Sequence, residues 1–380
     1  MSDRITVLIV DDSRIFRSAL EDALRGQPDI EVVGSVFNGA KALEFIRGRP
    51  PHVVTLDVEM PGLDGLATLK EIQSLNAGRD VAETVGVIMV SAFTRRGAEV
   101  TVKALQAGAF DFVTKPSGPS PDANLAALRE QVLPKIRACA RPRLRLSSPA
   151  VVAAPAAKPR VPRHRPFRAS APVRGIVIGA STGGPRALSI ILPDLCTRVA
   201  VPMFVVQHMP PDFTRSLAES LARQTRRNVV EASDGMSVTG AQVFIAPGGR
   251  HLVLRGSALA PAVGLSDAPP ENGCRPSADV LFRSAAAVFG REVLAMVLTG
   301  MGRDGTAGLG AIQRAGGYVI AQDEATSVVW GMPGSAVEAG VADEVIALPE
   351  IAGAAAAVVA GSKAGKRWSF RSRHSRNCRS

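Results

Sequence analysis

Aromatic side chains, closely spaced cysteines and long apolar runs are all scarce in this sequence, and each scarcity argues against a class of protein. Aromatics make up 4% of the 380 residues, too few for a surface that stacks the bases of single-stranded nucleic acid. The four cysteines have no C-x-x-C spacing, so we expect free thiols rather than a zinc site or a disulfide framework. No apolar run reaches the ~18 residues of a membrane span, and the first residues lack a signal-peptide layout. These observations predict a cytoplasmic protein with no membrane insertion.

Acidic residues are missing from two long stretches, one between Glu130 and Asp194 and one after Glu350. Lysine and arginine fill both stretches, so the net charge of +11 belongs mainly to a linker and a tail. Such segments are typically solvated, and weak binding to polyanions is the most that their charge implies. The tail keeps open a nucleic-acid-binding response regulator, but no helix-turn-helix pattern supports it. We expect no specific nucleic acid partner.

The chain length suggests two or three domains, and the alternation of apolar runs with helix-length stretches predicts two folded α/β domains. We assign the first domain to residues 1–140, a flexible Pro/Ala/Arg-rich linker to 141–173, the second domain to 174–360 and a basic disordered tail to 361–380. In the first domain, apolar runs alternate five times with amphipathic stretches of helical length. This pattern predicts a flavodoxin-like (βα)5 domain with a parallel sheet covered on both faces. The last helix is expected within Asp122–Ala138, kinked or shortened by Pro134.

Polar residues follow the apolar runs of the first domain at the points where the predicted strands end: Asp11, Asp12, Asp57, Ser91 and Lys115. Because parallel strands place their carboxyl ends at one edge, we expect these side chains to converge. Clustered carboxylates repel one another, and Mg²⁺ suits such an oxygen-only ligand set. A metal and Lys115 beside Asp57 would favour attack of this carboxylate on a phosphoryl group.

In the second domain, apolar runs again alternate with stretches of helical length, which predicts a doubly wound, mostly parallel α/β sheet. A short hairpin is expected to form from Gln242–Ala246 and His251–Arg255. Three predicted strands end at Ser181, His208 and Asp304, the residue types of a hydroxyl nucleophile, its base and an orienting carboxylate.

Ser181 lies in a G-x-S-x-G turn, where a serine hydroxyl can be exposed at the end of a strand. The same turn could instead bind phosphate or simply be tight. His208 could be a core histidine, His251 could compete as the base, and Asp304 could cap the following helix. The order Ser–His–Asp also differs from that of α/β-hydrolases. The backbone N–H groups of Thr182 and Met301 are candidates for an oxyanion hole.

The first domain closely resembles the receiver domain of two-component response regulators. The matching segments are VDDSR at Val10–Arg14, LDVEMPGLDG at Leu56–Gly65, SAFT at Ser91–Thr94 and KP at Lys115–Pro116. The resemblance implies Asp57 as the phosphoacceptor, with Ser91 and Lys115 as switch residues. It also implies Mg²⁺ bound by Asp11, Asp12, Asp57 and the backbone carbonyl of Val58, and a histidine kinase as phosphodonor.

The second domain resembles the catalytic domain of the chemotaxis protein-glutamate methylesterases. The matching segments, in family order, are GASTGGP, VVQHMP, IAPGGRHL, RPSADVLF and TGMGRDG. The resemblance implies a Ser181–His208–Asp304 mechanism without a cofactor in this domain. It implies hydrolysis of glutamyl methyl esters on methyl-accepting chemoreceptors, with deamidation of receptor glutamines. The long basic linker and the tail depart from the family pattern. A binding module that has lost catalysis stays a second hypothesis.

Overall fold

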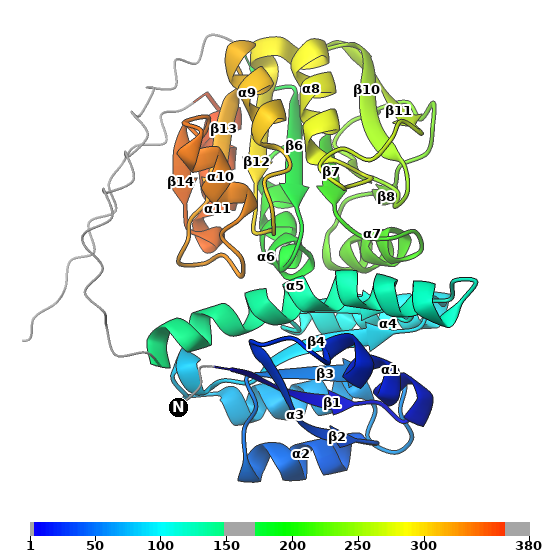
Figure 1. Ribbon diagram of the computed structural model, residues 1–380. Coiled ribbons are helices and arrows are strands. Elements are labelled where there is room, and N and C mark those ends of the chain that lie inside the picture. Colours follow the sequence, from blue (N-terminus) through cyan, green and yellow to red (C-terminus); the bar gives the residue numbers. More distant parts are fainter. Residues whose placement is uncertain (1–3, 148–171, 362–380) are drawn as a thin grey trace, which may run out of the picture.

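The computed structural model describes residues 4–147 and 172–361, which form two α/β domains stacked on each other (Figure 1). Most of the predicted linker, including His164, and the predicted tail lie outside the described residues. Within the described part of the chain, every helix is too short or too polar to cross a bilayer.

The N-terminal domain has a five-stranded sheet in the order β2-β1-β3-β4-β5, with every neighbouring pair parallel. This confirms the predicted (βα)5 topology. The strands are β1 (Ile5–Val10), β2 (Ile30–Val36), β3 (Val53–Asp57), β4 (Gly86–Ser91) and β5 (Asp111–Thr114), and the central strands β1, β3 and β4 are the richest in buried aliphatic residues. The helices that cover the sheet are α1 (Arg14–Leu24), α2 (Gly39–Gly48), α3 (Gly65–Asn76), α4 (Arg95–Gln106) and α5 (Pro121–Ser147).

Helix α5 is longer than the sequence predicts. It continues through Pro134 and past Ala138 to Ser147. The expectation that Pro134 shortens this helix was therefore wrong. Val132, Ile136 and Cys139 are buried in the core of the N-terminal domain, and this packing holds the helix together across the proline.

The C-terminal domain has a seven-stranded sheet in the order β14-β13-β12-β6-β7-β9-β8. All its strand pairs are parallel, which confirms the mostly parallel doubly wound fold. Its strands are β6 (Gly175–Ala180), β7 (Met203–Gln207), β8 (Val229–Glu231), β9 (Val243–Ile245), β12 (Val293–Val297), β13 (Tyr318–Gln322) and β14 (Glu344–Ile346). Its helices are α6 (Gly184–Arg198), α7 (Phe213–Gln224), α8 (Ala278–Phe289), α9 (Thr306–Arg314), α10 (Met332–Glu338) and α11 (Leu348–Val359).

The predicted hairpin was wrong in its pairing. Strand β9 joins the main sheet between β7 and β8, whereas β10 (His251–Ser257) pairs antiparallel with β11 (Ala260–Ser266). The two segments that the sequence seemed to join are thus separated by Pro247–Gly249, a turn that leads out of the sheet. The sequence correctly indicates a turn at these residues. It does not indicate which strands pair, because the pairing depends on packing against residues far away in the sequence.

The two domains share an apolar interface. Helix α4 packs against α6 and α7, and in Figure 1 α4 and α5 lie along the boundary between the domains. One cluster of buried residues runs through both domains and includes Leu105 and Phe112 on one side and Leu188, Phe213 and Leu217 on the other. The rings of Phe112 and Phe213 stack with centroids 4.6 Å apart.

Candidate active site and phosphoacceptor site

Three neighbouring strands in the middle of the C-terminal sheet carry the predicted catalytic residues. Ser181 follows β6 and His208 follows β7, while Asp304 lies in the loop between β12 and α9. The order β12-β6-β7 places the three strand ends side by side. The chain leaves β6 toward β7 and later returns to pair β12 with the other side of β6. This reversal is the place where open α/β sheets bind ligands.

Close backbone packing fixes the turn that carries Ser181. Its N–H donates to the carbonyl of Thr299 at 3.1 Å, and Gln207 Nε2 donates to the carbonyl of Ser181 at 2.9 Å. Gly183 has φ +79°, and a Cβ there would lie 2.7 Å from the Val328 side chain, so glycine is required. Gln207 has no distinctive motif role in the sequence, and its contribution is visible only in the structure.

The structure brings His208 and Asp304 together. His208 Nε2 lies 2.8 Å from Asp304 Oδ2. The carboxylate of Asp304 also accepts hydrogen bonds from the Ser277 hydroxyl at 2.7 Å, from Asn272 Nδ2 at 3.1 Å and from the Ala278 N–H at 2.6 Å. Ala278 is the first residue of α8, so Asp304 lies at a helix N-terminus, but not that of its own helix α9. Its role as a cap of α9 is thereby excluded.

These contacts set the charge states of the pair. Burial alone would raise the pKa of Asp304, but the bonds from His208, Ser277 and the Ala278 N–H hold it below its usual range. Burial alone would lower the pKa of His208, but the hydrogen bond to Asp304, together with the contact to the Cys274 thiol, outweighs it and raises the pKa to about 9. Asp304 is therefore an anion that stabilises the imidazolium form of His208.

Ser181 and His208 line one cavity of about 390 Å³, together with Thr182, Met301 and Cys274. In the described residues, neither the Thr182 nor the Met301 backbone N–H has a recorded acceptor, which leaves both available as oxyanion donors. The hydrogen bonds recorded there include none between Ser181 Oγ and the His208 ring. The sulfur of the Cys274 thiol lies 3.6 Å from His208 Nδ1.

His251 does not compete as the base. Its side chain is fully buried, its Nδ1 accepts the N–H of Ser277 at 3.2 Å, and its Nε2 lies 3.1 Å from the carbonyl of Pro269. Both ring nitrogens are thus satisfied inside the core. His251 thereby supports Ser277, whose hydroxyl donates to Asp304. The sequence did not single out Ser277, Asn272 or Cys274, because their relevance depends on the path of the loop between β11 and α8.

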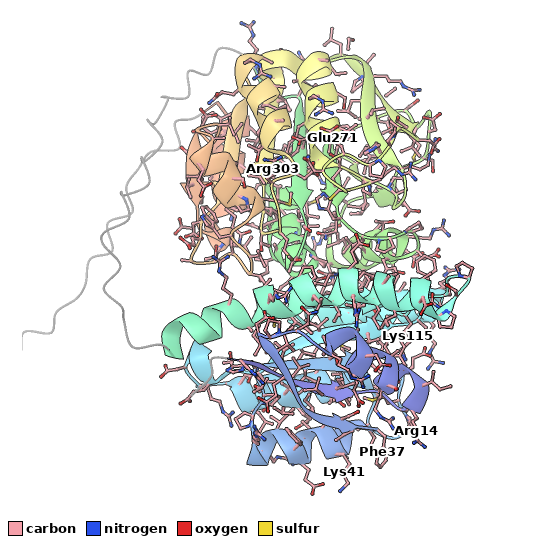
Figure 2. The ribbon with its side chains drawn as sticks, viewed as in Figure 1. Arg14, Phe37, Lys41, Lys115, Glu271 and Arg303 are labelled. Atoms are coloured by element: carbon pink, nitrogen blue, oxygen red, sulfur yellow. The ribbon has the colours of Figure 1, made fainter. Side chains whose placement is uncertain are left out.

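A second polar site lies in the N-terminal domain. Asp11, Asp12 and Asp57 place one oxygen each within 4.8 Å of one another, and Lys115 Nζ lies 2.8 Å from both Asp11 Oδ2 and Asp57 Oδ2. Burial is the main cause that raises the pKa of Asp57, to about 6. The hydrogen bond from Lys115 acts in the opposite direction, and the charge of Asp11 adds to the increase. Three carboxylates and one ammonium leave two negative charges, a donor set that fits Mg²⁺. Figure 2 shows Lys115 in this domain and Arg303, the neighbour of Asp304, in the other.

Two predicted members of this site make other contacts. The hydroxyl of Ser91 donates to the carbonyl of Ala92 at 3.2 Å rather than facing Asp57. The carbonyl of Val58 accepts the N–H of Gly65 at 3.1 Å. The three carboxylates fit a metal site by their geometry, and the Val58 carbonyl keeps a second lone pair, so its role as a ligand stays a prediction.

The N-terminal domain closes one side of the active-site cavity. Leu105, Asp111, Phe112 and Thr114 belong to its lining, as do Gln131 and Lys135 of α5. The hydroxyl of Thr182 donates to Asp111 Oδ2 at 2.5 Å, so a buried hydrogen bond joins this domain to the residue after Ser181. Substrate access to Ser181 is restricted in this arrangement.

Comparison with known proteins matches two separate parts of the chain to two families. Residues 7–125 match the family model of the response regulator receiver domain, and residues 176–355 match that of the CheB methylesterase. A protein-glutamate methylesterase/protein-glutamine glutaminase of Nocardioides sp. is 47% identical over 91% of this chain and 93% of its own length. The chain belongs to the protein-glutamate methylesterase/protein-glutamine glutaminase family. We refer to the two parts below as the receiver and the methylesterase domain.

A further relative supports this family, and a solved structure is also similar to part of the chain. The enzyme of the same name from Paraburkholderia xenovorans is 44% identical, with 92% of this chain and 94% of the relative covered. The crystal structure of the Thermotoga maritima CheB methylesterase catalytic domain is similar at 42% identity and a TM-score of 0.47. That match covers 48% of this chain and 97% of the solved chain.

Proposed function

We propose that this protein removes methyl esters from glutamate side chains of chemoreceptors, releases methanol, and also deamidates receptor glutamines. The observation that carries the proposal is the 2.8 Å bond between Asp304 and His208 Nε2, which leaves Nδ1 as the nitrogen free to act as base in the cavity shared with Ser181. A hydroxyl, a base and an orienting carboxylate are the groups that acyl transfer requires.

In the proposed reaction, Ser181 Oγ attacks the ester carbonyl carbon while His208 Nδ1 takes the hydroxyl proton. The backbone N–H groups of Thr182 and Met301 stabilise the negative oxygen of the tetrahedral intermediate. His208 then donates the proton to the departing methoxide, which leaves as methanol. Water, activated by His208, cleaves the acyl-enzyme and frees the glutamate carboxylate. With a glutamine substrate, ammonia is the first leaving group and the later steps are the same.

Ser181→Ala tests the assignment through methanol release from methylated receptor membranes. We expect release to fall to the background rate, because the neighbouring hydroxyl, that of Thr182, is held in a hydrogen bond to Asp111. Ser189→Ala is the matched control, since Ser189 lies on α6 outside the cavity and its hydroxyl donates to the Arg186 carbonyl. Full methanol release by Ser181→Ala would reject Ser181 as the nucleophile.

We propose that phosphorylation of Asp57 by a histidine kinase activates the enzyme in the cytoplasm. Mg²⁺ held by Asp11, Asp12 and Asp57 would neutralise charge on the phosphoryl group that Asp57 accepts. Lys115 is placed to pair with the phosphorylated side chain. In the unphosphorylated chain, β5 and α5 of the receiver restrict the cavity, so activation requires this face to move away.

A further inference from the structure

A thiol and an imidazole from distant parts of the chain meet in the active-site cavity. Cys274 lies in the loop between β11 and α8, and His208 lies at the end of β7. Cys274 Sγ is 3.6 Å from His208 Nδ1, and both residues line the cavity with Ser181. The catalytic steps proposed above give Cys274 no role.

The separation of these two atoms matches the edge of a zinc tetrahedron. With Zn–S of about 2.3 Å and Zn–N of about 2.0–2.1 Å, tetrahedral angles place the sulfur and the nitrogen about 3.6 Å apart. An ion could therefore bind both atoms without displacing either side chain. Cys274 is a partly exposed free cysteine, so its sulfur is accessible from the cavity.

The hydrogen bonds around His208 also fit a metal ligand. A histidine that binds a metal through one nitrogen typically donates the other N–H to a carboxylate, which fixes the ring and its tautomer. Asp304 bonds Nε2 at 2.8 Å and is itself held by Ser277 and Asn272. Asp304 thus serves as the outer support of the site, and in the neutral ring, with its N–H on Nε2, the lone pair of Nδ1 is directed toward the thiol.

We propose that a thiophilic divalent cation, with Zn²⁺ as the best fit, binds between His208 Nδ1 and Cys274 Sγ and reversibly inhibits the enzyme. Two protein ligands leave the other positions for water from the cavity, so the ion is an inhibitor and not a resident cofactor. The inhibitory effect rests on the proposed function, because the ion occupies the nitrogen that must take the proton of Ser181. Binding of the ion is independent of that role.

The two domains would then select different cations. The carboxylates of Asp11, Asp12 and Asp57 in the receiver suit the hard ion Mg²⁺. The sulfur and nitrogen of Cys274 and His208 suit Zn²⁺ or Co²⁺. Excess Mg²⁺ should therefore occupy the receiver without competing at the active site, which allows the second site to be titrated in the full-length protein.

Cobalt binding tests the site without any catalytic turnover. Full-length Ser181→Ala protein in excess Mg²⁺ is titrated with Co²⁺, and the thiolate-to-cobalt charge-transfer band is recorded in the near ultraviolet. We expect one Co²⁺ per chain, displaced by Zn²⁺, and no band in the Ser181→Ala/Cys274→Ser double variant. A band that is absent from the parent protein, or unchanged by Cys274→Ser, would overturn the proposal.

Zinc inhibition of methanol release tests the consequence. Loss of an outer-shell partner costs about tenfold in metal affinity. Loss of a direct ligand should cost more, so the Zn²⁺ concentration for half inhibition should rise by more than about tenfold. We expect this increase for Cys274→Ser relative to wild type, whereas Cys196→Ala, which changes a thiol on α6 outside the cavity, keeps the wild-type sensitivity. Equal sensitivity of wild type and Cys274→Ser would contradict inhibition at this site. If Ser181→Ala alone retained methanol release, the proposed function would fail while the cobalt result would still decide the metal site.

Discussion

Two buried aspartates, Asp57 in the receiver and Asp304 in the methylesterase domain, both lie on the carboxyl side of a central strand and have opposite electrostatics. Asp57 ends β3, Asp304 lies in the loop between β12 and α9, and each is at most 3% exposed. The pKa of Asp57 is raised to about 6, and that of Asp304 is held below its usual range. Their positions in the sheet therefore do not determine their chemistry.

The difference comes from the neighbours. Asp57 is buried beside the like charge of Asp11 and shares a single ammonium, that of Lys115, with it. Asp304 is surrounded by donors, namely an imidazole, a hydroxyl, an amide and a helix N-terminus. A carboxylate with too few donors favours a cation or a covalent phosphoryl group, whereas a fully bonded one can only orient its partner. This difference fits the proposed roles, with Asp57 as the phosphoacceptor and Asp304 as the orienting carboxylate.

Asp304→Asn should have the largest effect. An amide in this place can present its N–H to His208 Nε2 and fix the wrong tautomer, so kcat should fall by about 10⁴-fold while the fold is retained. Methanol release with circular dichroism as the folding control measures this. A loss of less than tenfold would show that the two aspartates differ less than the structure implies.

The pH dependence of kcat/KM is expected to show the next largest effect. His208 accepts a proton only when it is neutral, and its raised pKa of about 9 means that activity increases with pH. The rate should rise about tenfold per pH unit from pH 7 and level off near pH 9. The profile is measured on full-length protein over a range in which it stays folded. A plateau already reached at pH 7 would contradict the stabilisation of the imidazolium by Asp304.

Asp57→Asn should distinguish the role of Asp57 from that of Asp304 most clearly. This variant removes the phosphoacceptor, so a small phosphodonor with Mg²⁺ should no longer stimulate methanol release. Because Asp57 does not line the active-site cavity, the unstimulated rate should change by less than about twofold. Stimulation equal to that of wild type would place the phosphoacceptor elsewhere.

Asp111→Ala should weaken the contact between the domains. It leaves the hydroxyl of Thr182 without its acceptor when the receiver is docked, at a cost of about 1–3 kcal/mol. We expect the unstimulated rate to rise about tenfold. Glu219→Ala is the control, since its ion pair with Arg95 at 3.7 Å is exposed and contributes little. Equal effects of the two substitutions would argue against the buried hydrogen bond as the contact that matters.

Ser277→Ala should have the smallest effect. It removes one of several donors to Asp304, which costs about 0.5–1.5 kcal/mol and lowers kcat/KM by less than about tenfold. The pKa of Asp304 should rise toward its usual range, but the carboxyl stays ionised above pH 7. With one donor fewer, its charge favours the His208 imidazolium more strongly, so the alkaline inflection of the rate should shift to higher pH. A shift to lower pH would show that Ser277 acts by positioning Asp304 and not through its charge.

Much of this architecture could be predicted from the sequence because local pattern and strand position agree. The five apolar runs of the receiver became its five strands, and of the polar residues that follow them the three aspartates and Lys115 lie together as expected, whereas Ser91 bonds the Ala92 carbonyl. Ser181, His208 and Asp304 were also placed correctly at three strand ends. The predictions that were wrong concern features that depend on contacts with residues distant in the sequence. The proline in α5 is tolerated because Val132 and Ile136 are buried, and β10 pairs with β11 because β9 enters the main sheet.

The finer parts of the site were beyond prediction for the same reason. The loop between β11 and α8 has no periodic pattern, yet it delivers Asn272, Cys274 and Ser277 to Asp304 and His208. The hydrogen bond between Asp111 and Thr182 joins residues of two domains that no local pattern relates. Only the packed structure shows these contacts.

Active-site labelling tests the central claim most directly, that Ser181, His208 and Asp304 act together in the cavity that the receiver restricts. The full-length protein is treated with a fluorophosphonate, with and without a phosphodonor and Mg²⁺, and the modified residue is identified by mass spectrometry. The account predicts one adduct on Ser181, formed faster after phosphorylation and lost in His208→Ala. An adduct on another residue, or equally fast labelling of Ser181 in His208→Ala, would contradict it.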